Sequence, residues 1–259
     1  MKPQDIKNKL NEGGRVFGTM INFIEGARWA PAFSSKALDY VIIDSEHGPI
    51  SFETAQQMAI VCESRGVSPV MRIGSINESD ILKALDIGVH CIQIPNVKSI
   101  NDVNKIVKYC KYPPQGERGF SPFTRAGNYS INNSTKLTDS SNENTLIAIN
   151  IEGEDAIQNI DKILKVEEID IIFIGLFDLS KAIGMPGDVE HPKVQDYLRL
   201  LTNKIIDSGK YPGTISTSEE KISSFLDLGI KYIVHLVDCE MISNSYARIK
   251  QFFDEHTKK

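Results

Sequence analysis

Short apolar runs alternate with amphipathic segments along the chain. The apolar runs are rich in Val and Ile and are too short for helices, which is typical of buried parallel strands. They lie at residues 15–22, 41–43, 69–73, 91–94, 145–151, 170–175, 213–215 and 232–237. The amphipathic segments predict helices at residues 4–12, 25–37, 51–65, 78–86, 99–111, 154–166, 192–208, 218–228 and 239–256. Ser51, Asn77, Ser99 and Ser218 stand where helix N-caps are expected.

This alternation predicts the fold. Strands that alternate with helices are parallel and are joined by right-handed crossovers. Eight such units in 259 residues favour a closed barrel over an open doubly wound sheet. No G-x-G-x-x-G fingerprint or P-loop opens a predicted helix, which disfavours a nucleotide-binding sheet. We therefore predict an α/β fold, a (β/α)8 TIM barrel forming a single domain over residues 1–259, with one extra helix at each end.

Residues 113–144 interrupt the alternation. The stretch opens with Pro113-Pro114, and residues 128–144 are rich in Asn, Ser and Thr. Connections this long inside a compact domain are usually functional or disordered. We predict a long active-site loop here, which acts as a lid or a specificity segment.

Composition narrows the function classes. The 29 basic and 34 acidic residues give a net charge of −5, and no basic stripe supports binding to nucleic acid. The N-terminus has no apolar signal region and no segment is apolar enough to span a membrane, so we expect no membrane partner. The four cysteines are dispersed and form no C-x-x-C pair, which indicates reduced thiols of a soluble, cytoplasmic protein.

Chemically active side chains gather where the predicted strands end. A parallel barrel carries its chemistry at the carboxyl ends of its strands. The polar residues expected there are Asp44, Glu46, His47, Arg72, Asn150, Glu152 and Asp178. They come from four separate strands, so we expect acid, base and guanidinium groups to converge at one end of the barrel.

Glu152 and Asp178 follow neighbouring strands and supply hard oxygen ligands. Two carboxylates with open positions suit an octahedral Mg²⁺ or Mn²⁺ ion that binds a chelating substrate. The alternative is that each carboxylate caps the helix that follows it.

Arg72 and His47 complete the candidate site. A buried guanidinium keeps its charge and needs an anionic partner, either a neighbouring carboxylate or a substrate oxygen. His47 is the histidine that has acidic neighbours at a strand end, and its ordinary pKa suits a general base. The alternative for His47 is a hydrogen-bonded residue at a capped strand end.

The motifs together resemble those of a known family. Asp44-Ser45-Glu46-His47, Arg72, Gly116-x-Arg118-Gly119, Ile151-Glu152 and Gly175-x-x-Asp178-Leu179-Ser180 occur in the order found in the HpcH/HpaI aldolase family. These enzymes are metal-dependent class II pyruvate aldolases related to the citrate lyase β chain. The similarity runs from about residue 15 to about residue 240, and the first and last motifs together make it specific.

The resemblance implies roles for several residues. Glu152 and Asp178 would hold Mg²⁺ or Mn²⁺, with Co²⁺ as a further candidate, and the ion would chelate the 2-oxo acid. Arg72 would stabilise the enolate. His47 would deprotonate the substrate hydroxyl through water. Asp44, from the same motif, would belong to the catalytic residues as well. The family pairs this histidine with an aspartate that corresponds to Asp86. Asp86 ends a predicted helix at the opposite rim, so it would reach His47 only from a neighbouring subunit, and a solvated helix end is the alternative.

The resemblance also implies substrate contacts and an assembly. The expected substrate-binding residues are Arg118, Asn150, Gly175, Leu176 and Phe177. Leu176 replaces a common Pro, Phe177 is bulkier than usual, and Asn150 replaces a frequent Gln, so the pocket is expected to differ in shape. Family members are usually homo-oligomers, hexamers or trimers of dimers, in which the last helix, here residues 239–256, packs on a partner barrel.

The favoured function is carbon–carbon lyase activity. The expected reaction cleaves a 4-hydroxy-2-oxo acid or a 2-keto-3-deoxy sugar acid to pyruvate and an aldehyde. Other chemistry at the same metal site, of the acyl-CoA lyase or oxaloacetate decarboxylase type, is one alternative. A non-catalytic barrel that serves as a binding module is another.

Overall fold

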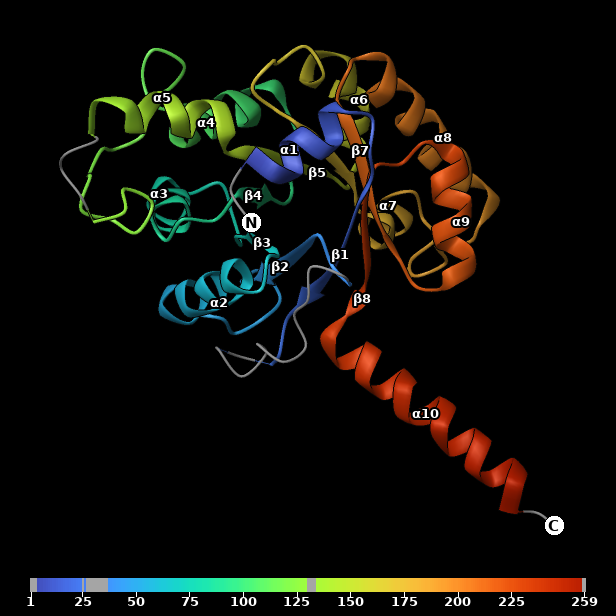
Figure 1. The fold of residues 1–259 in the computed structure, drawn as a ribbon. Coiled ribbons are helices and arrows are strands. Elements are labelled where there is room, and N and C mark those ends of the chain that lie inside the picture. The colour runs from blue at the N-terminus through green and yellow to red at the C-terminus, as the bar shows by residue number, and fades with distance from the viewer. Residues whose placement is uncertain (1–3, 25, 27–36, 130–133, 258–259) are drawn as a thin grey trace.

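The computed structural model describes residues 4–24, 26, 37–129 and 134–257. Eight parallel strands form a closed barrel in sequence order, and β8 pairs with β1 (Figure 1). The strands are β1 (Val16–Ile21), β2 (Tyr40–Asp44), β3 (Ser68–Arg72), β4 (Cys91–Ile94), β5 (Leu146–Ile151), β6 (Ile171–Ile174), β7 (Tyr211–Ser216) and β8 (Tyr232–Val237). The predicted single-domain TIM barrel is confirmed.

The chain also forms helices, most of which surround the strands on the outside (Figure 1). They are α1 (Gln4–Asn11), α2 (Phe52–Ser64), α3 (Glu78–Asp86), α4 (Ile100–Cys110), α5 (Ser134–Asn144), α6 (Glu154–Ile163), α7 (Leu176–Ala182), α8 (Pro192–Asp207), α9 (Glu219–Leu228) and α10 (Asp238–Thr257). The predicted caps are confirmed, because Ser51, Asn77, Ser99 and Ser218 each accept a backbone hydrogen bond from the first turn. The helix predicted at residues 25–37 lies almost entirely outside the described residues.

The strands separate two apolar layers. Alternate strand side chains fill the barrel interior, where the buried residues are Val16, Met20, Tyr40, Ile42, Val70, Cys91, Leu146, Ala148, Ile171, Phe173, Tyr232 and Val234. Ile6 and Leu10 of α1 join this cluster, so α1 covers the end of the barrel at which the strands begin. The opposite strand faces pack on the helices. Apolar side chains therefore fill the interior of the barrel, and the polar side chains of a candidate site are found at the ends of the strands.

The segment at residues 113–144 differs from the prediction. A continuous loop is wrong, because α5 occupies Ser134–Asn144. The segment joins the end of α4 to the start of β5, and Ala126 donates a backbone hydrogen bond to Asp86 at the end of α3. Within its own barrel this segment therefore lies at the end where strands begin, away from the predicted chemistry. Separately, α7 was not predicted as a helix.

A buried polar cluster ties this segment to the barrel. His90 is fully buried, and its ring nitrogens lie 3.0 Å from Ser68 Oγ and 2.8 Å from Glu63 Oε1. Arg125 donates to Glu63 Oε2 and, at 2.7 Å, to the carbonyl of Ile87. The hydrogen bonds to the buried imidazole, together with the charge of Arg125, hold the pKa of Glu63 below its usual value against the effect of burial.

We expect the His90→Ala substitution to destabilise the fold. It removes two hydrogen bonds at a buried site and leaves Ser68 and Glu63 without this partner, so the free energy of unfolding should fall by about 1–3 kcal/mol. Urea unfolding followed by circular dichroism measures the change. The exposed His256 near the C-terminus supplies the control, and an equally small change for His90→Ala and His256→Ala would contradict the structural role.

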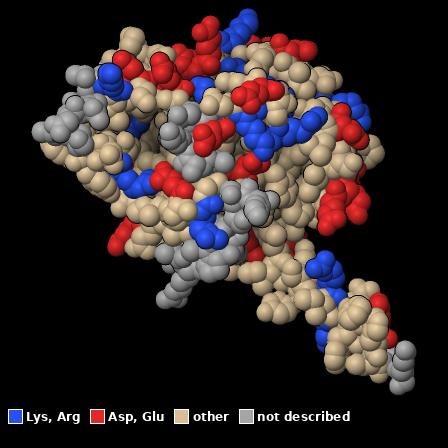
Figure 2. Space-filling view, viewed as in Figure 1, with Lys and Arg blue, Asp and Glu red and all other residues tan. Residues whose placement is uncertain are grey.

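The last helix extends away from the body of the molecule (Figure 1). Its side chains of Tyr246, Ile249, Phe252 and Phe253 are 71%, 59%, 62% and 59% exposed, and uncharged surface dominates most of the helix in Figure 2. Where α10 meets the barrel there is a largely apolar cavity of about 720 Å³, whose wall includes Phe17, Leu38, Met241, Ile242 and Tyr246. Within the described ranges, no helix has both the length and the apolarity needed to cross a membrane.

The cysteines behave as the sequence indicates. Cys62, Cys91 and Cys110 are buried free thiols, and Cys239 is an exposed one. Burial raises the pKa of Cys110 to about 12. Such thiols pack as small apolar side chains.

Candidate active site

Asp44 and Arg72 form a buried ion pair in the site. They are register partners at the carboxyl ends of β2 and β3. Arg72 Nε and Nη2 each donate to one oxygen of Asp44, both at 2.8 Å. Asp44 is fully buried and Arg72 is 8% exposed. The hydrogen bonds and charge of Asp44 raise the pKa of Arg72 despite its burial. A planar guanidinium gripped at two nitrogens has a fixed orientation.

Glu46 and His47 lie on the turn that follows β2. The Glu46 backbone N–H donates to Asp44 Oδ1 at 3.1 Å, which fixes the start of the turn. Gly48 lets the turn close, because a Cβ there would lie 2.4 Å from the carbonyl oxygen of Asn22 and 2.5 Å from that of Asp44. The position therefore accepts no side chain without moving the backbone that carries Glu46 and His47.

The Glu46 carboxylate lies between a cation and an imidazole. Its Oε2 is 3.1 Å from Arg72 Nη1 and 3.9 Å from His47 Nε2. Burial raises the pKa of Glu46 to about 6, with the charge of Arg72 opposing the rise and that of Glu152 adding to it. The His47 side chain is 62% exposed, so a substrate group or water can reach its ring.

Glu152 is oriented by a chain of amides. Asn150 Nδ2 donates to Glu152 Oε1 at 2.6 Å, and Gln93 Nε2 donates to Asn150 Oδ1 at 2.9 Å. The backbone N–H of Asn96 donates to Glu152 Oε2 at 3.2 Å. Burial raises the pKa of Glu152 and the negative charge of Asp178 adds to this, although the hydrogen bonds from Asn150 and Asn96 oppose it. A cation at this carboxylate would relieve that excess of negative charge.

Asp178 faces the same cavity as Glu152. It lies in the first turn of α7 and its side chain is 53% exposed, with Lys181 Nζ 3.7 Å away. The shared cavity has a volume of about 390 Å³, and its wall also includes Asn96 and Lys98. Gly175 permits this approach, because a Cβ there would lie only 2.7 Å from Glu152 Cγ.

The donor set fits a divalent ion. Within the described residues, Gly153 and Gly175 are the N-caps of α6 and α7 and neither makes a side-chain cap. Glu152 accepts from Asn150 and Asn96, and Asp178 lies beside Lys181, so the capping alternative is not observed. The described residues contain no group of three or more His, Cys, Asp and Glu side chains suited to a metal. Two carboxylate oxygens with open positions are the ligand set that Mg²⁺ or Mn²⁺ accepts when water and substrate supply the rest.

Two predicted site residues lie elsewhere. Asp86 ends α3, at the rim where strands begin, as expected from its sequence position. Arg118 Nη2 donates to Asp86 Oδ1 at 2.7 Å, and its guanidinium lies 4.6 Å from the centre of the Tyr112 ring. Arg118 is 5% exposed and belongs to this rim. Within its own barrel Arg118 therefore lies away from Arg72 and Glu152, because the segment that carries it follows a helix rather than a strand, and its contact with substrate stays a prediction.

The remaining predicted residues border the mouth of the barrel. Leu176 is 3% exposed and packs in the outer core, whereas Phe177 is 48% exposed. Asn150 donates a hydrogen bond to Glu152, and Gly175 leaves the space that the Glu152 side chain occupies. Of the pair that follows Gly175, therefore, Phe177 is the one exposed to a substrate.

Sequence reasoning missed Asn22 and Gln93. Asn22 follows β1, and its Nδ2 donates to Asp44 Oδ2 at 2.8 Å. Its Oδ1 is buried without a hydrogen-bond partner among the described residues. Gln93 is in β4 and supports Asn150. Both could have been found by asking which polar residues end the first and fourth strands.

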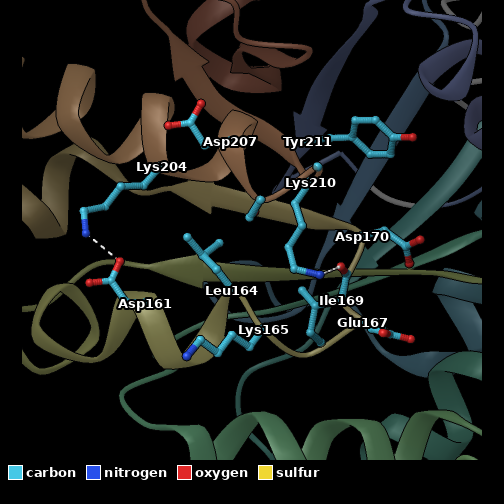
Figure 3. A pocket seen from close by; sticks show the side chains of 12 residues that line it. Asp161, Leu164, Lys165, Glu167, Ile169, Asp170, Lys204, Asp207, Lys210 and Tyr211 are labelled. Atoms are coloured by element: carbon cyan, nitrogen blue, oxygen red, sulfur yellow. Dashed lines mark hydrogen bonds and ion pairs between the residues drawn. The ribbon is translucent and has the colours of Figure 1, made fainter.

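A second, larger cavity lies at the opposite end of the barrel (Figure 3). It has a volume of about 750 Å³ and is lined by residues from the ends of α6 and α8 and the starts of β6 and β7. Lys204 pairs with Asp161 at 2.5 Å, and Lys210 donates to the carbonyls of Val166 and Ile169 at 2.6 and 2.7 Å. Lys204 and Lys210 are thus occupied, and parallel barrels carry their chemistry at the other end.

The chain is similar to known proteins over most of its length. Residues 23–244 match the family model described as HpcH/HpaI aldolase/citrate lyase. The chain is 30% identical over 243 residues to a hydroxypyruvate/pyruvate aldolase of Roseobacter denitrificans, covering 93% of each chain. It is 29% identical over 217 residues to a 4-hydroxy-2-oxo-heptane-1,7-dioate aldolase of Escherichia coli, covering 83% of this chain and 82% of the relative.

A solved structure shows the same likeness in three dimensions. The HpcH/HpaI aldolase of Desulfitobacterium hafniense superposes with a TM-score of 0.90 at 28% identity, over 96% of both chains. The family match covers far more than half of the sequence. The chain belongs to the HpcH/HpaI aldolase/citrate lyase family and is an enzyme of the aldolase or lyase type.

Proposed function

We propose that this enzyme cleaves a 4-hydroxy-2-oxo acid or a 2-keto-3-deoxy sugar acid to pyruvate and an aldehyde, and that it needs a divalent metal ion. The supporting observation is that an oriented guanidinium, Arg72, lies at the same end of the barrel as two carboxylates that share a cavity, Glu152 and Asp178. Arg72 and Glu152 are close enough for each charge to shift the pKa of the other group. The activities of the two aldolase relatives support the same class of substrate.

Glu152 and Asp178 would hold the ion, which is Mg²⁺ or Mn²⁺, with Co²⁺ as a further candidate. When bound, the ion would supply Lewis-acid chemistry to the carboxylate and 2-oxo oxygens of the substrate. The Asn150 amide and the Asn96 backbone N–H keep the Glu152 carboxylate in one orientation. Hydrogen bonds from surrounding groups to a ligating carboxylate raise the metal affinity of sites in proteins.

The other side chains move charge and protons. Arg72 donates to the 2-oxo oxygen as negative charge develops there during cleavage. His47 removes the proton of the 4-hydroxyl group through a water molecule. The bond between C3 and C4 then breaks to give the aldehyde and the enolate of pyruvate, and the enolate regains the proton at C3 through the same water molecule. Asp86 of a neighbouring subunit would orient His47, since Asp86 is at the opposite rim of its own barrel.

Exchange of the pyruvate methyl protons in D₂O tests this function. Proton NMR should show metal-dependent exchange that EDTA abolishes and Mn²⁺ restores. Borohydride with pyruvate should trap no covalent adduct. Absence of exchange at saturating Mg²⁺ or Mn²⁺ would count against the aldolase reaction. Turnover of CoA thioesters or oxaloacetate without exchange would instead favour the acyl-CoA lyase or decarboxylase alternatives.

We propose also that α10 packs on a second copy of this chain, in a hexamer or a trimer of dimers. The helix exposes an apolar face that includes Tyr246, Ile249 and Phe253. It projects from its own barrel (Figure 1). Contiguous apolar surface of this kind is costly in water and marks protein interfaces.

We expect the double substitution Tyr246→Glu and Phe253→Glu to lower the oligomeric state. Sedimentation velocity should show a smaller species, because two charges would enter an apolar interface. Asn244→Glu, on the polar face of the same helix, is the control and should leave the sedimentation coefficient unchanged. A wild-type monomer at micromolar concentration would exclude the proposed assembly.

A further inference from the structure

Arg72 is bound by two carboxylates of very different quality. Asp44 takes Nε and Nη2 with two hydrogen bonds of 2.8 Å and is fully buried. Glu46 Oε2 lies 3.1 Å from Nη1, yet it makes no hydrogen bond of good geometry with any described residue. The guanidinium is therefore firmly held on one side and loosely held on the other.

The loose contact occupies the nitrogen that a substrate needs. Asp44 uses Nε and one N–H of Nη2, and Met20 Sδ lies 3.3 Å from Nη2. Nη1 is thus the nitrogen not taken by Asp44 or Met20. An anionic oxygen that reaches Nη1 must approach the Glu46 carboxylate on the same nitrogen, and like charges a few ångströms apart repel.

We infer that Glu46 is the displaceable counter-ion of Arg72, which an oxygen of the bound 2-oxo acid replaces at Nη1. This inference rests on the proposed function, because it needs a 2-oxo acid at this site. Glu46 is a positioning residue in the free enzyme, where it balances the charge of the guanidinium. Its burial beside Glu152 raises its pKa to about 6, which agrees with a carboxylate whose negative charge is poorly compensated.

The displaced carboxylate makes the site selective. A simple monocarboxylate that meets Arg72 alone gains one contact and repels Glu46. A 2-oxo acid that also chelates an ion at Glu152 and Asp178 gains the additional binding energy needed to replace Glu46. The site is therefore expected to reject simple carboxylates and to accept chelating 2-oxo acids.

Binding of oxalate, a planar dianion that resembles the enolate of pyruvate, tests this role. Calorimetric titration at pH 7.5 with saturating Mn²⁺ should show that Glu46→Gln binds oxalate at least about fivefold more tightly than the wild type, because a repelling charge is removed. Glu53→Gln is the matched control. Glu53 is exposed in the first turn of α2, outside the cavity that Glu152 and Asp178 share, so its substitution removes the same charge away from the proposed metal site. A purely structural role for Glu46 would weaken binding instead.

The outcomes are distinct. Unchanged or weaker binding by Glu46→Gln, or an equal gain for Glu53→Gln, would overturn the inference while leaving the proposed function in place. No binding of oxalate to the wild type would remove both. A crystal structure of the wild-type enzyme with Mn²⁺ and oxalate gives an independent readout that needs no variant. An oxalate oxygen should then lie at Nη1 with Glu46 beyond hydrogen-bonding distance, and a Glu46 still seated on Nη1 would contradict the displacement.

Discussion

The Arg72→Ala enzyme should exchange the methyl protons of pyruvate about 10²–10³-fold more slowly than the wild type. The guanidinium is held by Asp44 in one orientation, so its N–H groups are already aligned when charge develops on the 2-oxo oxygen. The Arg72→Ala substitution removes the N–H donors that would face the 2-oxo oxygen. Proton NMR in D₂O at saturating Mn²⁺ measures the loss.

Arg72→Lys separates charge from geometry. Lysine keeps the positive charge but cannot hold both oxygens of Asp44 as a planar guanidinium does. We expect the Lys variant to remain folded and to recover only a small part of the exchange rate. The Ala variant leaves Asp44 buried without its cation, which typically costs about 3–5 kcal/mol, so thermal unfolding must accompany the rate measurement. An Arg72→Lys enzyme with wild-type exchange would show that orientation is unimportant.

The fold and most of the site could be predicted because both depend on local patterns. The alternation of apolar and amphipathic segments determines a barrel, and the barrel determines which strand ends meet. That reasoning brought Asp44, Arg72, Glu152 and Asp178 to one end, where the structure has them. Caps such as Asn77 were found because a side chain that accepts a backbone N–H acts within three residues of its own position.

The missed features depend on contacts between distant segments. Helix α5 has a polar sequence that resembles a loop, and it is held to the barrel by contacts such as the hydrogen bond from Lys111 Nζ to the carbonyl of Asn142. The family motif assigned Arg118 to the substrate pocket. The motif does not say at which end of the barrel Arg118 lies, because that depends on the direction of the chain between α4 and β5. The unequal hold of Asp44 and Glu46 on Arg72 depends on hydrogen-bond angles, which a motif does not contain.

Substitution of Asn150 by Ala should weaken Mn²⁺ binding by about 10–100-fold. Asn150 Nδ2 donates to Glu152 Oε1 at 2.6 Å and is itself held by Gln93. Without it, the buried Glu152 carboxylate loses both an orienting bond and a group that opposes the rise in its pKa. Glu152→Gln removes a proposed ligand and should lower the affinity for Mn²⁺ more than Asn150→Ala does. Electron paramagnetic resonance of free Mn²⁺ measures both affinities.

Gly175→Ala tests the same site by crowding rather than by removing a partner. The new Cβ would lie 2.7 Å from Glu152 Cγ, so Glu152 must shift from the position it shares with Asp178. We expect Mn²⁺ affinity to fall while the fold persists, because Gly175 has an ordinary φ of −80° that alanine adopts. Glu53→Gln, in the first turn of α2 and outside the cavity that Glu152 and Asp178 share, should bind Mn²⁺ as the wild type does. If Asn150→Ala and Gly175→Ala also bound Mn²⁺ normally, Glu152 could not be the ligand, because both changes act on that one carboxylate.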